Sequence, residues 1–177
     1  MQLRLHNFRS AAGGRYWFIS NSLRLDRIDL YRYDGKNLTL AKRIPLPKLP
    51  SHMAFTADST MAFITQQGSN QVSAIDLATQ TVKWTMPVGP APAGITMTPD
   101  GKHLLVGIMG SDYVEVIDWR TQKTVKRIKA GAGTHNFRAL GDKRMTFVSN
   151  RVSNTINIID QQTLENVGTI NVPGGPD

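Results

Sequence analysis

The stretch that decides the fold is Val114-Glu115-Val116-Ile117-Asp118, a short strand-like run that closes on an acidic residue. Similar runs stand once before it and once after it, as Val72-Ser73-Ala74-Ile75-Asp76 and Ile156-Asn157-Ile158-Ile159-Asp160. The closing aspartates follow each other at a constant spacing of 42 residues. The chain is therefore a repeat, and its period is a stronger guide to structure than any single residue.

A period of about 40 to 45 residues with several short strands in each unit is typical of a β-propeller blade. In the clearest unit we expect strands at about 93–98, 103–107, 113–118 and 124–129. Pro99-Asp100-Gly101 supplies a tight turn between the first two strands. The aspartates that close the third strands stand three residues before a threonine, which predicts an Asx turn closed by the hydroxyl. These pairs are Asp76 with Thr79, Asp118 with Thr121 and Asp160 with Thr163.

The beginning of the chain also belongs to the repeat, because His6-Asn7-Phe8-Arg9 matches His135-Asn136-Phe137-Arg138. We expect a single all-β domain, a partial propeller of four-stranded antiparallel blades that spans residues 1–177. Its blades are predicted at about 3–49, 50–91, 92–133 and 134–175. Residues 172–177 resemble the start of another inner strand, so four blades of a ring of about seven are expected. The remaining blades would come from a longer parent chain or from a second copy.

Composition fits an all-β domain and excludes several kinds of site. The chain has no cysteine, which excludes disulfides, thiolate chemistry and zinc sites built on cysteine. No apolar run is long enough to span a membrane, and the first residues, Met1-Gln2-Leu3-Arg4-Leu5-His6, lack a secretory signal. For the parent protein we expect a periplasmic or extracellular location, with any signal segment removed.

Positive charge is concentrated in two zones of the sequence. The chain has 21 Lys and Arg against 13 Asp and Glu, a formal charge of +8. Residues 1–48 and 102–151 hold ten basic residues each. One interpretation is an anionic partner, such as single-stranded nucleic acid, a glycan or lipid headgroups. The other is solvated outer strands that resist edge pairing, which we favour because no aromatic platform lies among these charges. The cations of one such strand are Lys123, Lys126, Arg127 and Lys129.

The matched motif also supplies the candidate site. His6 and Arg9 in the first unit, and His135 and Arg138 in the fourth, would start inner strands that line the central channel. We predict a ligand site at the channel mouth formed by these four residues. Imidazole can ligate a metal or haem iron, and guanidinium can bind a carboxylate or phosphate. The alternative is that the motif bonds to neighbouring blades. His52 lies one position out of register with His135, and His103 is expected at an exposed strand start.

Motifs of known catalysis are missing from the sequence. It has no Gly-x-Ser-x-Gly elbow, phosphate loop, His-Glu-x-x-His or haem attachment motif. The aspartates are assigned to turns, so enzymatic action by this chain alone is not expected. Trp17, Trp84 and Trp119 lie in different units. They are expected to pack between sheets rather than to form a binding cage.

A resemblance to a known family rests on the third unit. Its run from Pro92 to Lys102, its apolar strand, and Val114-Glu115-Val116-Ile117-Asp118 with Thr121 resemble the YVTN-type bacterial β-propeller repeat. The likeness covers roughly residues 50–173. Propellers of this superfamily include surface-layer and periplasmic binding proteins, the haem-d1 propeller of nitrite reductases, and quinoprotein amine dehydrogenase subunits.

The resemblance and the residues together lead to one expected function and two alternatives. We expect a non-catalytic scaffold that binds a ligand or a protein without a cofactor. One alternative is the propeller part of a redox enzyme that holds haem or pairs with a catalytic subunit. The other is a basic propeller that binds single-stranded DNA.

Overall fold

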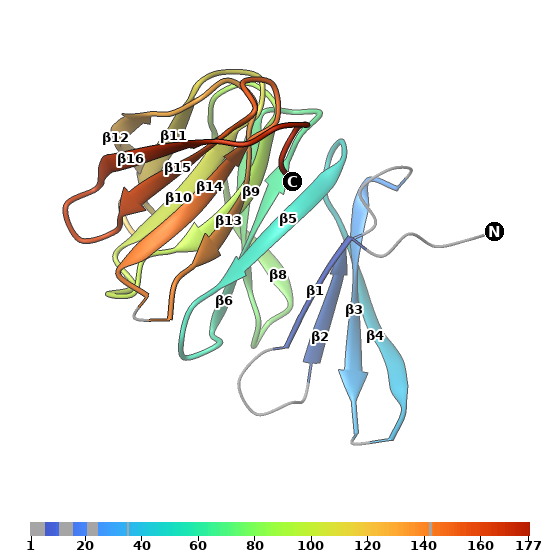
Figure 1. Cartoon of the computed structure of the whole chain (residues 1–177). Coiled ribbons are helices and arrows are strands. Elements are labelled where there is room, and N and C mark those ends of the chain that lie inside the picture. The colour runs from blue at the N-terminus through green and yellow to red at the C-terminus, as the bar shows by residue number, and fades with distance from the viewer. Residues whose placement is uncertain (1–5, 11–15, 21–24, 35, 142) are drawn as a thin grey trace. The chain divides into compact units, whose positions relative to one another are not determined.

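The computed structural model describes residues 6–10, 16–20, 25–34, 36–141 and 143–177, and side chains from residue 25 onward except that of Tyr33. Its strands form four sheets of four, which we call blades 1 to 4 (Figure 1). Blade 1 contains β1 (His6–Ser10), β2 (Tyr16–Ser20), β3 (Arg27–Tyr33) and β4 (Leu38–Pro45). Blade 2 contains β5 (Pro50–Phe55), β6 (Met61–Gln66), β7 (Gln71–Asp76) and β8 (Thr81–Pro87). Blade 3 contains β9 (Pro92–Met97), β10 (His103–Ile108), β11 (Tyr113–Asp118) and β12 (Lys123–Lys129). Blade 4 contains β13 (Thr134–Ala139), β14 (Met145–Asn150), β15 (Thr155–Asp160) and β16 (Glu165–Asn171).

Each blade is an antiparallel meander in which strands adjacent in the sequence pair with each other. The strands of blade 3 begin and end within one residue of the bounds expected from the sequence. This is the fold class that the 42-residue period predicts, a partial β-propeller, and the prediction is confirmed.

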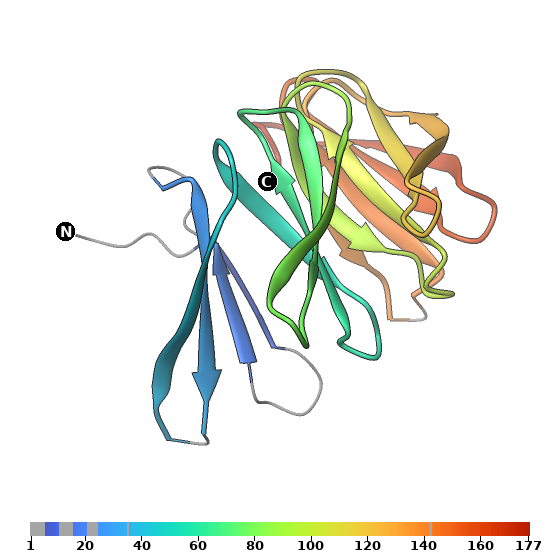
Figure 2. The ribbon, with the colours of Figure 1, turned by 180° about the vertical axis from the view of Figure 1, so that it is seen from behind.

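The chain divides into two compact units, Met1–Pro87 with blades 1 and 2 and Val88–Asp177 with blades 3 and 4. Each unit has an apolar core between its two sheets. In the first unit the core consists of Ile28, Leu30, Ile44, Leu46, Met53, Ala62, Ile64 and Ile75. In the second it consists of Leu105, Val114, Val116, Ile128, Val148 and Ile159. The sheets of blades 3 and 4 lie face to face, as the two opposite views show (Figure 1; Figure 2).

These cores give every blade two distinct faces. In each unit the first blade packs on the second through one face, which we call the forward face; the equivalent face of every blade takes the same name, and the opposite face is the rear face. In blade 3 the forward face carries Val114, Val116 and Ile128, and it meets Val148 and Ile159 on the rear face of blade 4. Strand alternation explains the division, because side chains two residues apart point to the same side of a sheet.

The repeated aspartates form turns, as expected. Asp118 Oδ1 accepts the main-chain N–H groups of Arg120 and Thr121 at 2.9 and 3.2 Å. Asp76 and Asp160 accept equivalent amides. The threonine contributes its amide to the turn, and in the turns of Asp76 and Asp118 a hydrogen bond from its hydroxyl also lowers the pKa of the carboxyl group. The amide of Thr121 is the main reason why the pKa of the Asp118 carboxyl lies below its ordinary value.

The inner strand of each blade begins with a β-bulge, after which regular pairing with the second strand resumes. A hydroxyl satisfies the displaced amide in two blades. Thr65 Oγ1 accepts the His52 N–H at 3.0 Å, and Ser149 Oγ accepts the Asn136 N–H at 3.0 Å. Because a bulge re-aims side chains, it fixes how the first residues of an inner strand are presented.

Candidate site at the inner-strand ends

The predicted site residues lie on the inner strands, and the structure describes two of the four. His6 and Arg9 belong to β1, whose side chains lie outside the described residues. His135 and Arg138 belong to β13, and both are described. The copy of the doubled motif in blade 4 is thus the one whose side chains the structure describes.

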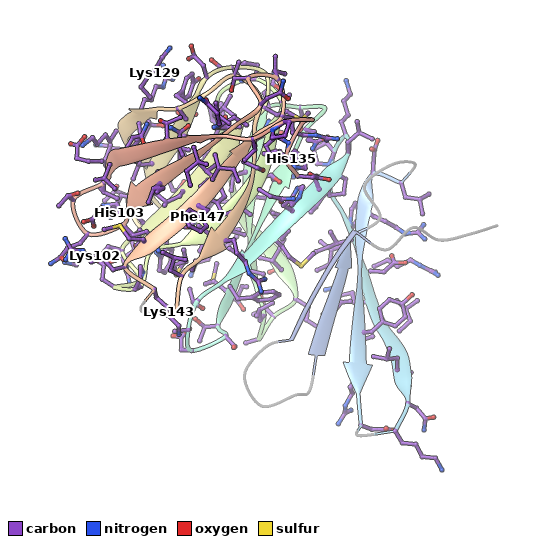
Figure 3. All side chains as sticks on the ribbon, in the orientation of Figure 1. Lys102, His103, Lys129, His135, Lys143 and Phe147 are labelled. Carbon is purple, nitrogen blue, oxygen red and sulfur yellow. The ribbon has the colours of Figure 1, made fainter. Side chains whose placement is uncertain are left out.

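His135 is buried at the bulge, with 8% of its surface exposed (Figure 3). Its Nδ1 lies 2.6 Å from Oδ1 of Asp177. Asn136 Nδ2 donates to the same oxygen at 3.4 Å. Asp177 follows His135 by one repeat period, so it occupies the position of His135 in the following repeat.

Electrostatics keep this imidazole neutral. Burial lowers the pKa of His135 most strongly, because it penalises the charged form. The Asp177 carboxylate raises this pKa, and the positive charge of Arg151 lowers it again. The balance leaves the pKa below its ordinary value. At neutral pH the imidazole is therefore a donor and acceptor of hydrogen bonds rather than a cation.

The backbone of His135 makes close contact with blade 3. A side chain on Gly94 would collide with the carbonyl oxygen of His135, and a Cβ on Gly107 would lie 3.1 Å from it. Thr134 Oγ1 lies 2.8 Å from the carbonyl oxygen of Ile108 and 3.0 Å from that of Tyr113. The start of β13 is thus seated on blade 3. Blade docking, the alternative weighed for this motif, is a role that these contacts serve.

Arg138 lies three residues further along β13 and is exposed. In the ladder it stands opposite Phe147 of β14, which Figure 3 labels. Cross-strand partners share a face, so Arg138 lies on the forward face of blade 4. His135 instead lies at the strand start beside Asp177.

A second polar cluster, which was not predicted from the sequence, lies at the start of β5. Ser51 Oγ is 2.8 Å from Nδ1 of His52, and Gln67 Nε2 donates to Ser51 Oγ at 3.0 Å. Ser51 Oγ thus joins the Gln67 amide and the His52 imidazole in one hydrogen-bonded group. The signal was in the repeat: Ser51 and His52 occupy the positions of His135 and Asn136.

Aromatic side chains do lie among the basic residues of blade 3, which corrects the expectation from the sequence. The guanidinium of Arg120 lies 4.3 Å from the ring centre of Trp119, and that of Arg127 lies 4.9 Å from the ring centre of Tyr113. Trp119 also donates from Nε1 to the carbonyl oxygen of Gly101 at 3.0 Å. Trp119 therefore stacks on an arginine beside a turn.

Several cations of the outer strand β12 are paired with acidic groups. Lys126 pairs with Glu165, and Lys129 pairs with Asp112. Arg127 lies 3.5 Å from the buried carboxylate of Glu115. Part of the positive charge counted from the sequence is thus neutralised at short range.

Acidic groups in blade 3 are committed to the scaffold. Glu115 is 1% exposed and accepts the Gly89 N–H and the Thr124 hydroxyl, both at 2.8 Å. Among the residues that the structure describes, no group of three or more His, Asp or Glu side chains is arranged to hold a metal ion. Within the same residues, no helix is long and apolar enough to cross a membrane.

Comparison with known proteins agrees with this fold. The family model described as YNCE-like beta-propeller matches residues 5–177. Hydrazine synthase of Kuenenia stuttgartiensis superposes with a TM-score of 0.83 at 20% identity, over 94% of this chain and 49% of that one. A candidate 6-phosphogluconolactonase of Bacteroides fragilis gives 0.82 at 22% identity, over 97% and 56%.

A third solved structure, the dihydro-haem d1 dehydrogenase NirN, gives a TM-score of 0.73 at 16% identity, over 97% of this chain and 38% of that one. The chain therefore spans only part of the length of these similar structures: 49%, 38% and 56% of the three. At these identities the likeness concerns the fold alone. No curated protein matches the chain in sequence.

Proposed function

Since the chain belongs to the YNCE-like β-propeller family, we propose that it is part of a non-catalytic propeller that binds a ligand or a protein partner. The observation that supports this proposal is that four acidic side chains are engaged in hydrogen bonds within the scaffold. Asp76, Asp118 and Asp160 hold turns, and Glu115 is buried in a hydrogen-bonded junction. General acid and base catalysis needs carboxyl groups in reach of a substrate, and these four are already engaged.

The ligand site of this scaffold lies at the inner-strand ends, and its ligand is anionic. His135 offers a neutral imidazole, Asn136 a half-buried amide, and Arg151 a positive charge that acts on His135. Arg138 adds an exposed guanidinium on the same strand. By the likeness of the motifs, His6 and Arg9 form the corresponding group in blade 1. Guanidinium keeps its charge at any accessible pH, which suits a phosphate or carboxylate.

Inorganic phosphate is a suitable probe, followed by the NMR shifts of backbone amides. We expect phosphate to move the amide signals of residues 134–138 and Arg151. The combined change His135→Ala with Arg138→Ala should abolish these shifts, whereas Lys123→Ala with Lys126→Ala on the outer strand should leave them intact. Shifts that depend on the outer-strand lysines instead would refute the location.

A second candidate function, binding of single-stranded DNA, is supported by the stacked pairs of blade 3. Trp119 with Arg120, and Tyr113 with Arg127, combine an aromatic face with a cation, as single-strand binders do. The probe is a labelled oligothymidylate in a fluorescence anisotropy titration at several salt concentrations. Trp119→Ala should weaken binding, Trp84→Ala in blade 2 should not, and affinity should fall steeply with salt. An equal loss of oligothymidylate affinity in both variants would argue against binding at the stacked pairs of blade 3.

The redox alternative and the cellular location are tested on protein from the native host. Haem bound to a propeller would give a Soret absorption band in the purified protein, and a band that survives gel filtration would favour this alternative over the scaffold. For the parent protein we propose a periplasmic or extracellular location. Cell fractionation tests it, and recovery in the cytoplasmic fraction would contradict it.

A further inference from the structure

The turn between the second and third strands departs from the repeat in blade 4. In blades 2 and 3 this turn carries Gly68 and Gly110, whereas blade 4 has Val152 at the same position. Val152 is 72% exposed, more than any other large hydrophobic residue that the structure describes. A single exposed valine is ordinary on a protein surface, but here the neighbouring backbone is shaped to admit it.

The linker before each blade explains why the other turns carry glycine. A Cβ on Gly110 would lie 2.8 Å from the carbonyl oxygen of Pro90, and the next linker residue, Ala91, carries a side chain at φ of 50°. Blade 2 is alike, since a Cβ on Gly68 would lie 2.9 Å from Cβ of Lys48. In both blades the linker therefore leaves no room for a side chain on the turn.

Blade 4 exchanges these roles. Its linker has Gly133 at the position of Ala91, with φ of 77°, and a Cβ on Gly133 would lie 2.8 Å from Cγ2 of Val152. The turn still bonds to its linker as in blade 3, because the Val152 N–H donates to the carbonyl oxygen of Ala132 at 3.1 Å. The linker thus lacks a side chain at the point where the turn presents one.

This turn position is exposed even where a further blade follows. Gly110 is exposed in blade 3, although blade 4 packs on that blade in the same unit. The linker that leads out of a blade passes the turn in both cases. The Asp112 carbonyl oxygen accepts a linker N–H at 2.8 Å, and that of Asn154 accepts the Val172 N–H at 2.9 Å. The surroundings of Val152 therefore include both of the linkers that border this turn in blade 3.

Arg151 stands directly before Val152 and belongs to the anion site proposed above. It is exposed, and its positive charge lowers the pKa of His135, so its guanidinium lies near that imidazole. None of the ion pairs formed by the described residues involves Arg151. The equivalent pairs of residues are Gln67 with Gly68 and Met109 with Gly110. Of these three turns, the one in blade 4 alone combines a cation with an aliphatic side chain.

We propose that the ligand is an amphipathic anion, a carboxylate or phosphate joined to a short aliphatic chain, with its charge at Arg151 and its chain on Val152. This inference rests on the proposed anion site and adds the chemical class of its ligand. Val152 lies between the exposed polar residues Arg151 and Ser153. One valine in that setting offers contact for a few methylene groups rather than for a broad apolar surface.

The test compares anions that differ only in chain length. The full chain is titrated with acetate and with hexanoate, and the NMR shifts of the backbone amides of residues 134–138 and Arg151 report binding. Hexanoate should bind about tenfold more tightly than acetate, because methylene groups that leave water favour binding. Val152→Ser should remove this difference and leave the affinity for acetate unchanged. Val125→Ser, at a valine of β12 that is 52% exposed, is the matched control and should keep the difference. Methyl phosphate and butyl phosphate give the same comparison for phosphates.

The outcomes separate this inference from the proposed function. If long and short anions bind equally well in both series, the aliphatic chain is not recognised, and the inference is wrong while the anion site stands. A preference for the longer anion that persists in Val152→Ser would overturn it as well. If no anion moves these amide signals, the anion site and the inference both fail. Should Val152→Ser not fold, Val152→Gly replaces it, since glycine is the residue of blades 2 and 3 at this position.

Discussion

At the scale of single residues, left-handed backbone recurs with the period of the sequence. Gln80, Gln122 and Leu164 follow the third strands at intervals of 42 residues, with φ of 56°, 57° and 58°. Gly101 adopts φ of 67° in the first hairpin of blade 3. Side chains other than glycine are strained in this region because Cβ approaches the following carbonyl oxygen.

Gln122→Gly should therefore raise the free energy of unfolding, by up to about 1 kcal/mol after the entropy cost of glycine is subtracted. The reciprocal change Gly101→Ala should lower it by about 1 kcal/mol, although nothing lies within 4 Å of the added Cβ. Urea denaturation measures both. If Gly101→Ala leaves stability unchanged, backbone strain is not the reason for glycine at this turn.

His135 makes stability depend on pH. Its pKa in the folded chain lies below 6.5, chiefly through burial, whereas the unfolded chain titrates near 6.5. As pH falls below about 6.5, the unfolded state takes up the proton first, so acid lowers the free energy of unfolding. Above that pH the neutral His135 makes its full contribution to stability. His135→Gln should flatten the dependence between pH 5 and pH 7, while His103→Gln should retain it. Equal slopes for the unchanged chain and His135→Gln would contradict this assignment.

At the scale of elements, the middle of each third strand holds a buried polar side chain whose identity varies. It is Ser73 in blade 2, Glu115 in blade 3 and Asn157 in blade 4. Each is hydrogen-bonded: Ser73 to Gln66 and Thr85, and Asn157 to the linker before its blade. The position ties the blade to its surroundings through whichever donors are present.

Glu115→Gln should lower the free energy of unfolding by about 1 to 3 kcal/mol, because one carboxylate oxygen becomes an NH2 group that faces a donor. Glu165 is exposed and pairs with Lys126. The variant Glu165→Gln should therefore have a free energy of unfolding within about 0.5 kcal/mol of that of the unchanged chain. Thermal unfolding followed by circular dichroism compares them. A Glu115 variant as stable as the control would show that this junction rearranges freely.

The approach of β13 to β9 supplies a second prediction for this scale. Gly94→Ala places a methyl group against the His135 carbonyl oxygen, so the inner strands must separate, and stability should fall by about 2 kcal/mol or more. Gly141→Ala is the control, since nothing lies within 4 Å of its Cβ and its φ is not positive. If Gly94→Ala lowers stability no more than Gly141→Ala does, β13 is not held against blade 3.

The elements of this fold were predictable because the repeat averages out local ambiguity. Alternation and turn residues located the strands of blade 3 within one residue. The pairing of His135 with Asp177 was not foreseen, although both residues occupy equivalent positions, because the burial of His135 depends on the bulge in which it lies. The stacking of Arg120 on Trp119 was not predicted, because no aromatic platform was found among the basic residues of the sequence. The turn conformation brings the two side chains together, and the repeat period does not reveal the conformation of a turn.

At the scale of the whole chain, each unit has its own core, so damage to one core should stay largely local. Ile64→Ala in the first unit should cost about 2 to 5 kcal/mol and reduce hydrogen-exchange protection mainly in β5 to β7. Ile159→Ala should do the same for β14 and β15 in the second unit. Protection lost equally in both units by either variant would show that the chain unfolds as one cooperative block.

The meander within each blade has a consequence for how the protein is made. Because every ladder joins strands adjacent in the sequence, a blade can complete its hydrogen bonds as soon as its fourth strand leaves the ribosome. Within each unit, the apolar forward face of the first blade is then covered when the second blade emerges. Synthesis from the N-terminus thus supplies the partner surface in the order in which it is needed, and the time between blades sets how long a nascent sheet stays exposed to aggregation.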